Sequence, residues 1–122
     1  MLDHISLHIS DYARSKEFYL KALKPLGYEL LMPFEERKMA GLGAEGKMDF
    51  WIDENETSKT THIAFRAKDR KEVDEFYKAA LAAGGKDNGA PGLRPNYHKD
   101  YYGAFVLDPD GNNIEAVCHL EE

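Results

Sequence analysis

Hydrophobic and polar residues alternate from Leu2 to Ser10, which is the pattern of a strand with one buried face. The polar face of this strand carries His4, Ser6 and His8. Apolar residues then recur at helical spacing after Asp11, whose carboxylate can accept a hydrogen bond from the first turn of a helix. The chain is therefore predicted to open with a strand and a helix.

Three short strands are predicted after this helix, which Pro25 and Gly27 end. They cover Tyr28–Phe34, Arg37–Leu42 and Met48–Ile52, with a turn over Gly41–Gly46 between the last two. The turn sequence Gly-Leu-Gly-Ala-Glu-Gly matches a dinucleotide-binding fingerprint, but that fingerprint requires a helix after its glycines and a strand follows here. We therefore interpret it as a hairpin turn, and the first half of the chain as β-α-β-β-β.

The second half of the chain repeats the first without a gap. His4-Ile5 recurs as His62-Ile63, and the helix cap, the apolar helix stripe and the helix stop recur as well: Asp11 as Asp69, Phe18-Tyr19 as Phe76-Tyr77, Ala22-Leu23 as Ala80-Leu81, and Gly27 as Gly85. Matches at the positions that define a supersecondary unit indicate a tandem repeat. We expect one α+β domain over 1–122, made of βαβββ modules at 1–53 and 60–120 that bury their sheet faces against a common centre.

The elements of the second module are predicted by the same patterns, over Thr60–Ala67, Asp69–Ala83, Tyr101–Leu107 and Asn112–His119. Residues 84–100, rich in Gly and Pro, are predicted to form a long loop with a short strand inside it. Asp108-Pro109-Asp110-Gly111 closes a hairpin, because Pro109 presets its backbone angle and Gly111 tolerates positive φ.

Composition narrows the class of function. The 122 residues carry a formal net charge of -6, which argues against binding a phosphate backbone. The chain has neither an apolar run long enough to cross a bilayer nor an export signal at its start. The one cysteine, Cys118, has no partner for a disulfide or a zinc site. We expect a cytoplasmic protein that binds a small molecule, with no nucleic-acid or membrane partner.

Three residues indicate a metal site. His4 and His62 occupy equivalent positions on the first strand of each module, and Glu115 lies among apolar residues of the last strand, where a carboxylate is costly to bury unless something positive meets it. A lone strand histidine is more often a structural residue, but the repetition raises the odds of a shared role. Two imidazoles and one carboxylate suit Zn, Mn, Ni or Fe(II) and leave coordination positions open.

The sequence resembles the vicinal oxygen chelate superfamily, which includes glyoxalase I, fosfomycin resistance proteins, bleomycin resistance proteins and extradiol dioxygenases. The resemblance lies in His4-Ile-Ser-Leu-His8 with Asp11 and Phe18-Tyr19, then Thr61-His62-Ile63-Ala64-Phe65, then Asp108 to Val117. It implies a glyoxalase/bleomycin resistance/dioxygenase fold with a cupped mixed sheet, a divalent metal ion on His4, His62 and Glu115, and a homodimer.

One position departs from the glyoxalase I pattern. Such members usually carry a second glutamate on the fourth strand of the first module, where this chain has Met48-Asp49-Phe50-Trp51-Ile52. Phe50 or Trp51 stands nearest the expected place, and Asp49 is a weak substitute. The pattern has three ligands, as in the fosfomycin-resistance and dioxygenase relatives.

Further polar and aromatic residues are candidates to line the site. Glu115 and His8 are the candidate proton carriers, and Arg66 would suit an anionic group of the substrate. Trp51 is a candidate cavity wall, and Asp49 is a further candidate for substrate binding. The remaining candidates for substrate binding lie in or beside the predicted loop, which we interpret as a lid: Arg94, Tyr97, His98, Tyr101 and Tyr102.

The leading functional hypothesis is a glyoxalase-like, metal-dependent lyase or isomerase that acts on a small substrate with neighbouring oxygen atoms, such as a thiol adduct. Thiol transfer or extradiol dioxygenation at the same metal site is the first alternative. The second is a metal-free protein that binds an antibiotic or metabolite, as bleomycin resistance proteins do. Intact His4, His62 and Glu115 argue against this binder.

Overall fold

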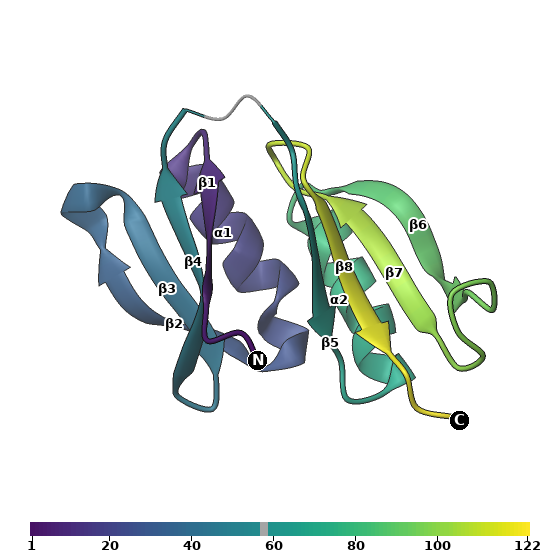
Figure 1. The fold of residues 1–122 in the computed structure, drawn as a ribbon. Coiled ribbons are helices and arrows are strands. Elements are labelled where there is room, and N and C mark those ends of the chain that lie inside the picture. Colours follow the sequence, from purple (N-terminus) through teal and green to yellow (C-terminus); the bar gives the residue numbers. More distant parts are fainter. Residues whose placement is uncertain (57–58) are drawn as a thin grey trace.

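The computed structural model describes residues 1–56 and 59–122, which form two βαβββ modules that lie side by side (Figure 1). The first module consists of β1 (Ile5–Ile9), α1 (Tyr12–Ala22), η1 (Lys24–Leu26), β2 (Tyr28–Phe34), η2 (Glu35–Arg37), β3 (Met39–Ala44) and β4 (Lys47–Glu54). The second consists of β5 (His62–Arg66), α2 (Arg70–Ala82), β6 (Lys86–Leu93), β7 (Tyr102–Leu107) and β8 (Asn113–Cys118). The predicted α+β fold of tandem βαβββ units is confirmed.

Each module has a four-stranded mixed sheet of the same topology. The strand orders are β1-β4-β3-β2 and β5-β8-β7-β6, with the first strand parallel to the last and the other pairs antiparallel. In both modules the first strand lies beside the last strand of its own module, so a residue on β8 stands next to one on β5. This topology brings Glu115 of β8 beside the histidine strand.

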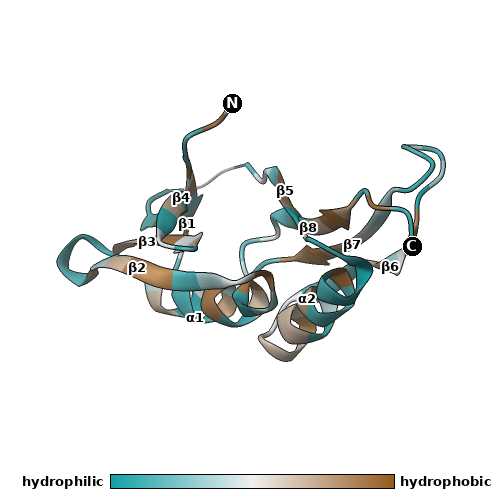
Figure 2. Cartoon of the chain, turned by 90° about the horizontal axis from the view of Figure 1, so that it is seen from below, coloured by the Kyte–Doolittle hydropathy of each residue, from teal (hydrophilic) through white to brown (hydrophobic). Residues whose placement is uncertain are grey.

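Helices α1 and α2 cover the same side of the two sheets, and the opposite sheet faces are open (Figure 2). The helices begin where the sequence predicts, because Asp11 accepts a hydrogen bond from Arg14 N at 3.1 Å and Asp69 accepts one from Glu72 N at 2.9 Å. Alternate strand residues such as Ile9 are buried under the helices, whereas the polar residues between them face the open side. Among the described residues, no helix is both long enough and apolar enough to span a membrane.

The modules meet through helices α1 and α2 and through η1, and not through their open sheet faces (Figures 1 and 2). Phe65 of β5 packs edge-on against Phe50 and Tyr28 of the first module, with ring centroids 5.2 and 5.4 Å apart. The buried residues of both modules form one common core on the helix side of the sheets. The polar faces on the opposite side do not pack on each other within the chain.

The largest differences from the predicted boundaries lie at the end of β3 and in β6. β3 continues through the glycines to Ala44, and the turn is only Glu45 and Gly46, with φ of 54° and 77°. Gly43 lies so close to β4 that a Cβ would stand 1.7 Å from the carbonyl oxygen of Lys47. The close approach of the two strands, and not a turn, therefore requires glycine at this position. The strand predicted inside the loop over 84–100 is the eight-residue β6, an edge strand whose register shifts twice and which tolerates Pro91 for that reason.

Candidate metal centre

Glu115 and His62 form a close pair on the open face of the second sheet. Glu115 is 1% exposed, and its Oε1 lies 3.1 Å from Nε2 of His62, whose side chain is half exposed. Strand pairing places Glu115 between Ala64 of β5 and Phe105 of β7, so the carboxylate sits in the middle of the sheet. A buried carboxylate beside an accessible imidazole can receive a cation from solvent.

The ring of His62 is oriented by a second contact. Its Nδ1 lies 3.0 Å from the carbonyl oxygen of Asn113, which can only accept, so Nδ1 carries the proton and Nε2 of the neutral ring keeps its lone pair. The ring also stacks on Phe105, with centroids 6.2 Å apart. His62 thus presents Nε2 toward Glu115.

The separation of these two donors fits a shared metal ion. Ligand atoms about 2.1 Å from one ion and at right angles to each other lie about 3.0 Å apart. The 3.1 Å between His62 Nε2 and Glu115 Oε1 is close to that value. Imidazole nitrogen with carboxylate oxygen is also a donor set that Zn, Mn, Ni and Fe(II) accept. One imidazole nitrogen and one carboxylate oxygen are thus placed as two ligands of a divalent metal ion would be.

Tyr101 holds the other oxygen of the Glu115 carboxylate. Its hydroxyl donates a hydrogen bond to Oε2, so the two carboxylate oxygens face different partners. Burial first, and then the hydrogen bond and charge of Glu115, raise the pKa of Tyr101 well above the ordinary value for tyrosine. Tyr101 is thus a neutral donor at physiological pH.

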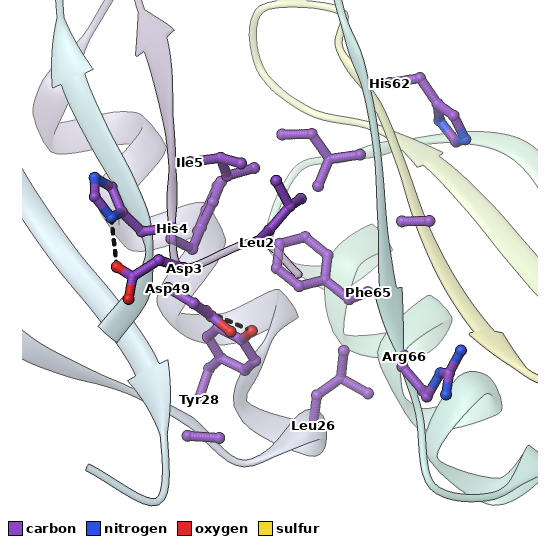
Figure 3. Close-up of a pocket in the computed structure, with 14 residues that line it drawn as sticks. Leu2, Asp3, His4, Ile5, Leu26, Tyr28, Asp49, His62, Phe65 and Arg66 are labelled. Atoms are coloured by element: carbon purple, nitrogen blue, oxygen red, sulfur yellow. Dashed lines mark hydrogen bonds and ion pairs between the residues drawn. The ribbon is translucent and has the colours of Figure 1, made fainter. Parts of the chain in front are cut away.

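His4 lies on the other side of the junction between the modules and does not join this pair (Figure 3). A cleft of about 580 Å³ is lined by both histidines, but their rings point to opposite sides, with Ile5 and Phe65 between them. Nδ1 of His4 lies 2.7 Å from Oδ1 of Asp3, which leaves Nε2 free. Within residues 1–56 and 59–122, no three His, Cys, Asp or Glu side chains gather as a metal site.

Trp51 occupies the position in the first module that corresponds to Glu115. β1 pairs Ser6 with Trp51, and β5 pairs Ala64 with Glu115, each two residues after the histidine of that strand. The indole stacks on the exposed ring of Phe34, with centroids 6.1 Å apart and an angle of 13° between the rings. An aromatic surface thus stands where a second carboxylate would lie.

Asp49 is not near that position. The pairing of β3 with β4 shifts beside it, from Leu42–Phe50 to Gly43–Met48, so Asp49 has no partner on β3. Its carboxylate turns into the cleft and accepts a hydrogen bond from the hydroxyl of Tyr28 at 2.7 Å (Figure 3).

His8 forms a second histidine–carboxylate pair on the open face of the first sheet. It pairs across β1 and β4 with Asp53, and its Nδ1 lies 2.5 Å from Oδ1 of that residue. The carboxylate is the more buried partner, with 21% of its side chain exposed against 56% for the imidazole. Asp53 therefore orients the ring and leaves Nε2 of His8 accessible.

The other predicted site residues divide between the two faces of the second sheet. Arg66 lines the cleft, and Arg94 lies over the ring of Phe105, 5.5 Å from its centroid, which places it near His62. Tyr102 points to the helix side, where its hydroxyl donates to Asp74 at 2.7 Å. Burial, followed by that hydrogen bond, raises the pKa of Tyr102 to about 12.

Tyr97 and His98 lie in the loop before β7, beyond the Glu115 pair. The ring of Tyr97 packs edge-on against Tyr101 at 5.2 Å, and the ring of His98 packs against His119 at 5.8 Å. These two residues surround Tyr101 and contact neither His62 nor Glu115 in the hydrogen bonds of the described chain.

Several residues that shape the centre were absent from the sequence-based candidates. Asp53 could have been found, because the alternation that puts Trp51 on the open face also puts Asp53 there. The carbonyl of Asn113 and the ring of Phe105 carry no such signal, since their roles depend on strand register.

Comparison with known proteins gives one family over nearly the whole chain. The family described as the Glyoxalase/Bleomycin resistance protein/Dioxygenase superfamily matches residues 1–116. No curated protein matches the sequence.

Solved structures resemble the chain along its length. A glyoxalase/bleomycin resistance protein from Albidiferax ferrireducens T118 is 26% identical, with a TM-score of 0.81, covering 98% of this chain and 99% of that one. A glyoxalase I mutant from Zea mays is 27% identical, with a TM-score of 0.67, covering 95% of this chain and 46% of that one. Lactoylglutathione lyase from Agrobacterium tumefaciens, 18% identical with a TM-score of 0.72 and covering 97% and 92%, shares the fold.

Proposed function

Because this chain belongs to the glyoxalase/bleomycin resistance protein/dioxygenase superfamily, we propose that it is a metal-dependent enzyme, a glyoxalase-like lyase or isomerase. Its substrate would be a small molecule with neighbouring oxygen atoms, such as a thiol adduct. The observation that carries the proposal is the pair of donors in the second module, His62 Nε2 and Glu115 Oε1, 3.1 Å apart. The solved structure named as glyoxalase I, which is 27% identical, supports the reaction class.

The proposed metal ligands are His4, His62 and Glu115, and the ion is Zn, Ni, Mn or Fe(II). His4 and His62 share the arrangement expected of ligands, because an oxygen acceptor holds Nδ1 of each ring, which leaves Nε2 of His4 open and directs Nε2 of His62 toward Glu115. When bound, such an ion supplies Lewis-acid chemistry to neighbouring oxygen atoms of a substrate.

The ligand set is completed by a second copy of the chain in this proposal. His4 points away from His62 across the junction, so one chain offers His62 with Glu115 in one place and His4 in another (Figure 3). Both sheets leave their polar faces open on the same side (Figure 2). In a two-fold homodimer, the first module of one protomer can face the second module of its partner, which pairs each His4 with the other protomer's donors.

The chain's own residues supply the proton chemistry. Glu115 is a carboxylate in a nearly dry position, so it can take a proton from a carbon or oxygen atom next to it. His8 is the second candidate, since Asp53 fixes its ring and leaves Nε2 accessible on the face that carries His4. Arg66 and Arg94 would bind anionic parts of the substrate, with Trp51, Asp49, Tyr97 and His98 as the remaining candidates; Tyr102 is not among them, because it points to the helix side of the sheet.

Thiol transfer or extradiol dioxygenation is the second candidate function. The observation that favours it is Trp51, which occupies the position equivalent to Glu115 and leaves the site with three protein ligands. A metal-free binding protein is the third candidate and would not need the donor pair of His62 and Glu115.

Metal analysis of the purified protein is the first test. The wild type should bind one divalent ion per chain, and His62→Ala and Glu115→Ala should lose it. Wild-type binding no tighter than that of these variants would exclude the enzyme and favour the binder. If metal binds, hemithioacetal isomerisation tests the glyoxalase-like activity, and turnover of a catechol in its place would assign a dioxygenase.

Subunit mixing tests the shared site. His4→Ala and Glu115→Ala each break both sites of a homodimer. A mixed dimer of the two variants has one intact site if the ligands come from different protomers, and none if they come from one. Recovery of metal binding on co-refolding is expected, and a mixture as inactive as its components contradicts the shared site.

A further inference from the structure

The carboxylate of Glu115 makes a different contact with each of its oxygen atoms. Oε1 faces Nε2 of His62 at 3.1 Å, and Oε2 accepts the hydrogen bond of Tyr101. A free carboxylate can bind a metal ion through one oxygen or both. In this arrangement only Oε1 is presented beside the imidazole.

We propose that Tyr101 is a positioning residue of the metal centre, which fixes the Glu115 carboxylate so that it binds through Oε1 alone. This inference rests on the proposed metal-dependent function. It gives Tyr101 a role that acts through a ligand, in place of the substrate contact expected from its position in a loop. The consequence is a coordination position that stays open for substrate.

The neighbours of this hydrogen bond are arranged to keep it in place. A Cβ on Gly103 would stand 3.2 Å from Oε2 of Glu115 and 3.2 Å from the Tyr101 ring, so a side chain here would push the ring or the carboxylate away by a few tenths of an ångström. The backbone of Tyr101 is held at both ends of its peptide, because its carbonyl accepts from Arg94 N at 2.7 Å and its N–H donates to His98 O at 3.2 Å.

The ring of Tyr101 is also fixed from its sides. Tyr97 packs edge-on against it at 5.2 Å and His119 at 5.1 Å. Two aromatic neighbours and the backbone hydrogen bonds already fix the ring. Its hydroxyl can therefore contact Glu115 without a further loss of side-chain conformational entropy. This is the property that a positioning residue needs.

Removal of the hydroxyl should weaken metal binding. In Tyr101→Phe, Oε2 of a nearly buried carboxylate loses its donor, and the carboxylate can rotate or bind through both oxygens. Loss of an outer partner of a metal ligand typically costs 10–100-fold in metal affinity, so we expect a loss of about that size.

Tyr97→Phe is the matched control. Tyr97 belongs to the same loop, touches the Tyr101 ring, is 62% exposed, and its hydroxyl makes no hydrogen bond in the described part of the chain. The same atom is removed from the same residue type, but the Glu115 contact is left intact. Its metal affinity should stay within about twofold of the wild type.

The experiment measures Zn²⁺ affinity by competition with a chromophoric chelator and the visible spectrum of the Co²⁺ complex, for wild type and both variants. The melting temperature of each metal-free protein is recorded as well, since a merely structural role would lower it without changing the Co²⁺ spectrum. Tyr101→Phe should lose affinity and change the spectrum, with Tyr97→Phe like the wild type.

Each failure points to a different cause. Normal wild-type binding with an unaffected Tyr101→Phe overturns the positioning role alone. Equal losses in the two variants overturn it too, because they would reflect the loop and not the hydroxyl. Wild-type binding no tighter than that of His62→Ala overturns the proposed function and this inference with it.

Discussion

The hydroxyl of Tyr19 in α1 donates a buried hydrogen bond to Asp108, the first residue of the turn between β7 and β8. Asp108 also accepts from the backbone and the side chain of Asn112, at 2.8 and 2.9 Å. Two residues on, Asp110 accepts from the backbone N–H of Ser10 at 3.1 Å. The turn that leads into the Glu115 strand is therefore attached to the first module, so the two modules are joined near the start of the strand that carries the candidate ligand.

Tyr19→Phe should destabilise the protein by roughly 1.5–3 kcal/mol, the usual contribution of a hydrogen bond to a charged group. The control is Tyr77→Phe, because Tyr77 is the repeat equivalent of Tyr19 and donates to Asp87 at the surface, at 3.0 Å. That change should cost less than about 0.5 kcal/mol. Urea unfolding measures the loss of unfolding free energy in both variants. Equal losses would show that the buried Tyr19 hydrogen bond contributes no more to stability than the surface one.

The same bond predicts a loss of stability at alkaline pH. Burial first, and then the charge and hydrogen bond of Asp108, raise the pKa of Tyr19 well above its ordinary value. A group with a raised pKa in the folded state contributes fully below the unfolded pKa, about 10 for tyrosine, and the contribution is lost as the pH rises above it. The free energy of unfolding should fall more steeply above about pH 10 in the wild type than in Tyr19→Phe, and parallel curves would contradict this.

Most of the fold could be predicted from the sequence because local patterns determined it. The alternation around His4, the Asp11 and Asp69 caps, and the Asp108 turn each act within a few residues. The end of β3 could not, because Gly43 is required by its closeness to the Lys47 carbonyl, which only the paired strand reveals. Composition alone made this glycine look like part of a turn.

The true turn, Glu45-Gly46, gives a stability prediction. Both residues have positive φ, as in the two-residue hairpin turns that favour Asn-Gly, and Glu45 bears the cost of this conformation. Glu45→Asn should therefore stabilise the protein by about 0.5–1 kcal/mol in thermal or urea unfolding. Glu45→Ala removes the same charge without easing the backbone, and a gain as large in this control would contradict the explanation.

The site was predictable only in part. Repetition singled out His4 and His62, and an acidic residue in an apolar strand singled out Glu115. That His4 points away from the other two depends on the side-by-side packing of the modules, which no local pattern encodes (Figure 3). Tyr102 faces the helix because strand alternation places it on the same face as the buried Ala104 and Val106.

His8 gives a prediction for catalysis. If its Nε2 carries a proton in the reaction, His8→Gln should lower kcat for hemithioacetal isomerisation by about 10²-fold and leave metal affinity nearly unchanged. Asp53→Asn should produce a smaller fall in kcat, because it affects only the orientation of the ring. Steady-state kinetics with metal titrations measure both. A change in metal affinity would place His8 among the ligands, and unchanged kcat in His8→Gln would remove it from the reaction.

Trp51 gives the sharpest test of how the metal centre is composed. If it stands where a fourth ligand would lie, Trp51→Glu should raise the affinity for Zn²⁺ by about tenfold, which corresponds to ~1.4 kcal/mol. The change also removes the stacking on Phe34 and uncovers Gly41, so stability should fall. Trp51→Gln is the matched control, because it loses the same packing but adds no carboxylate. A gain of affinity in the glutamate variant alone supports the equivalence of Trp51 and Glu115, which rests on the strand register. Equal affinities in both variants would show that this position lies outside the metal centre.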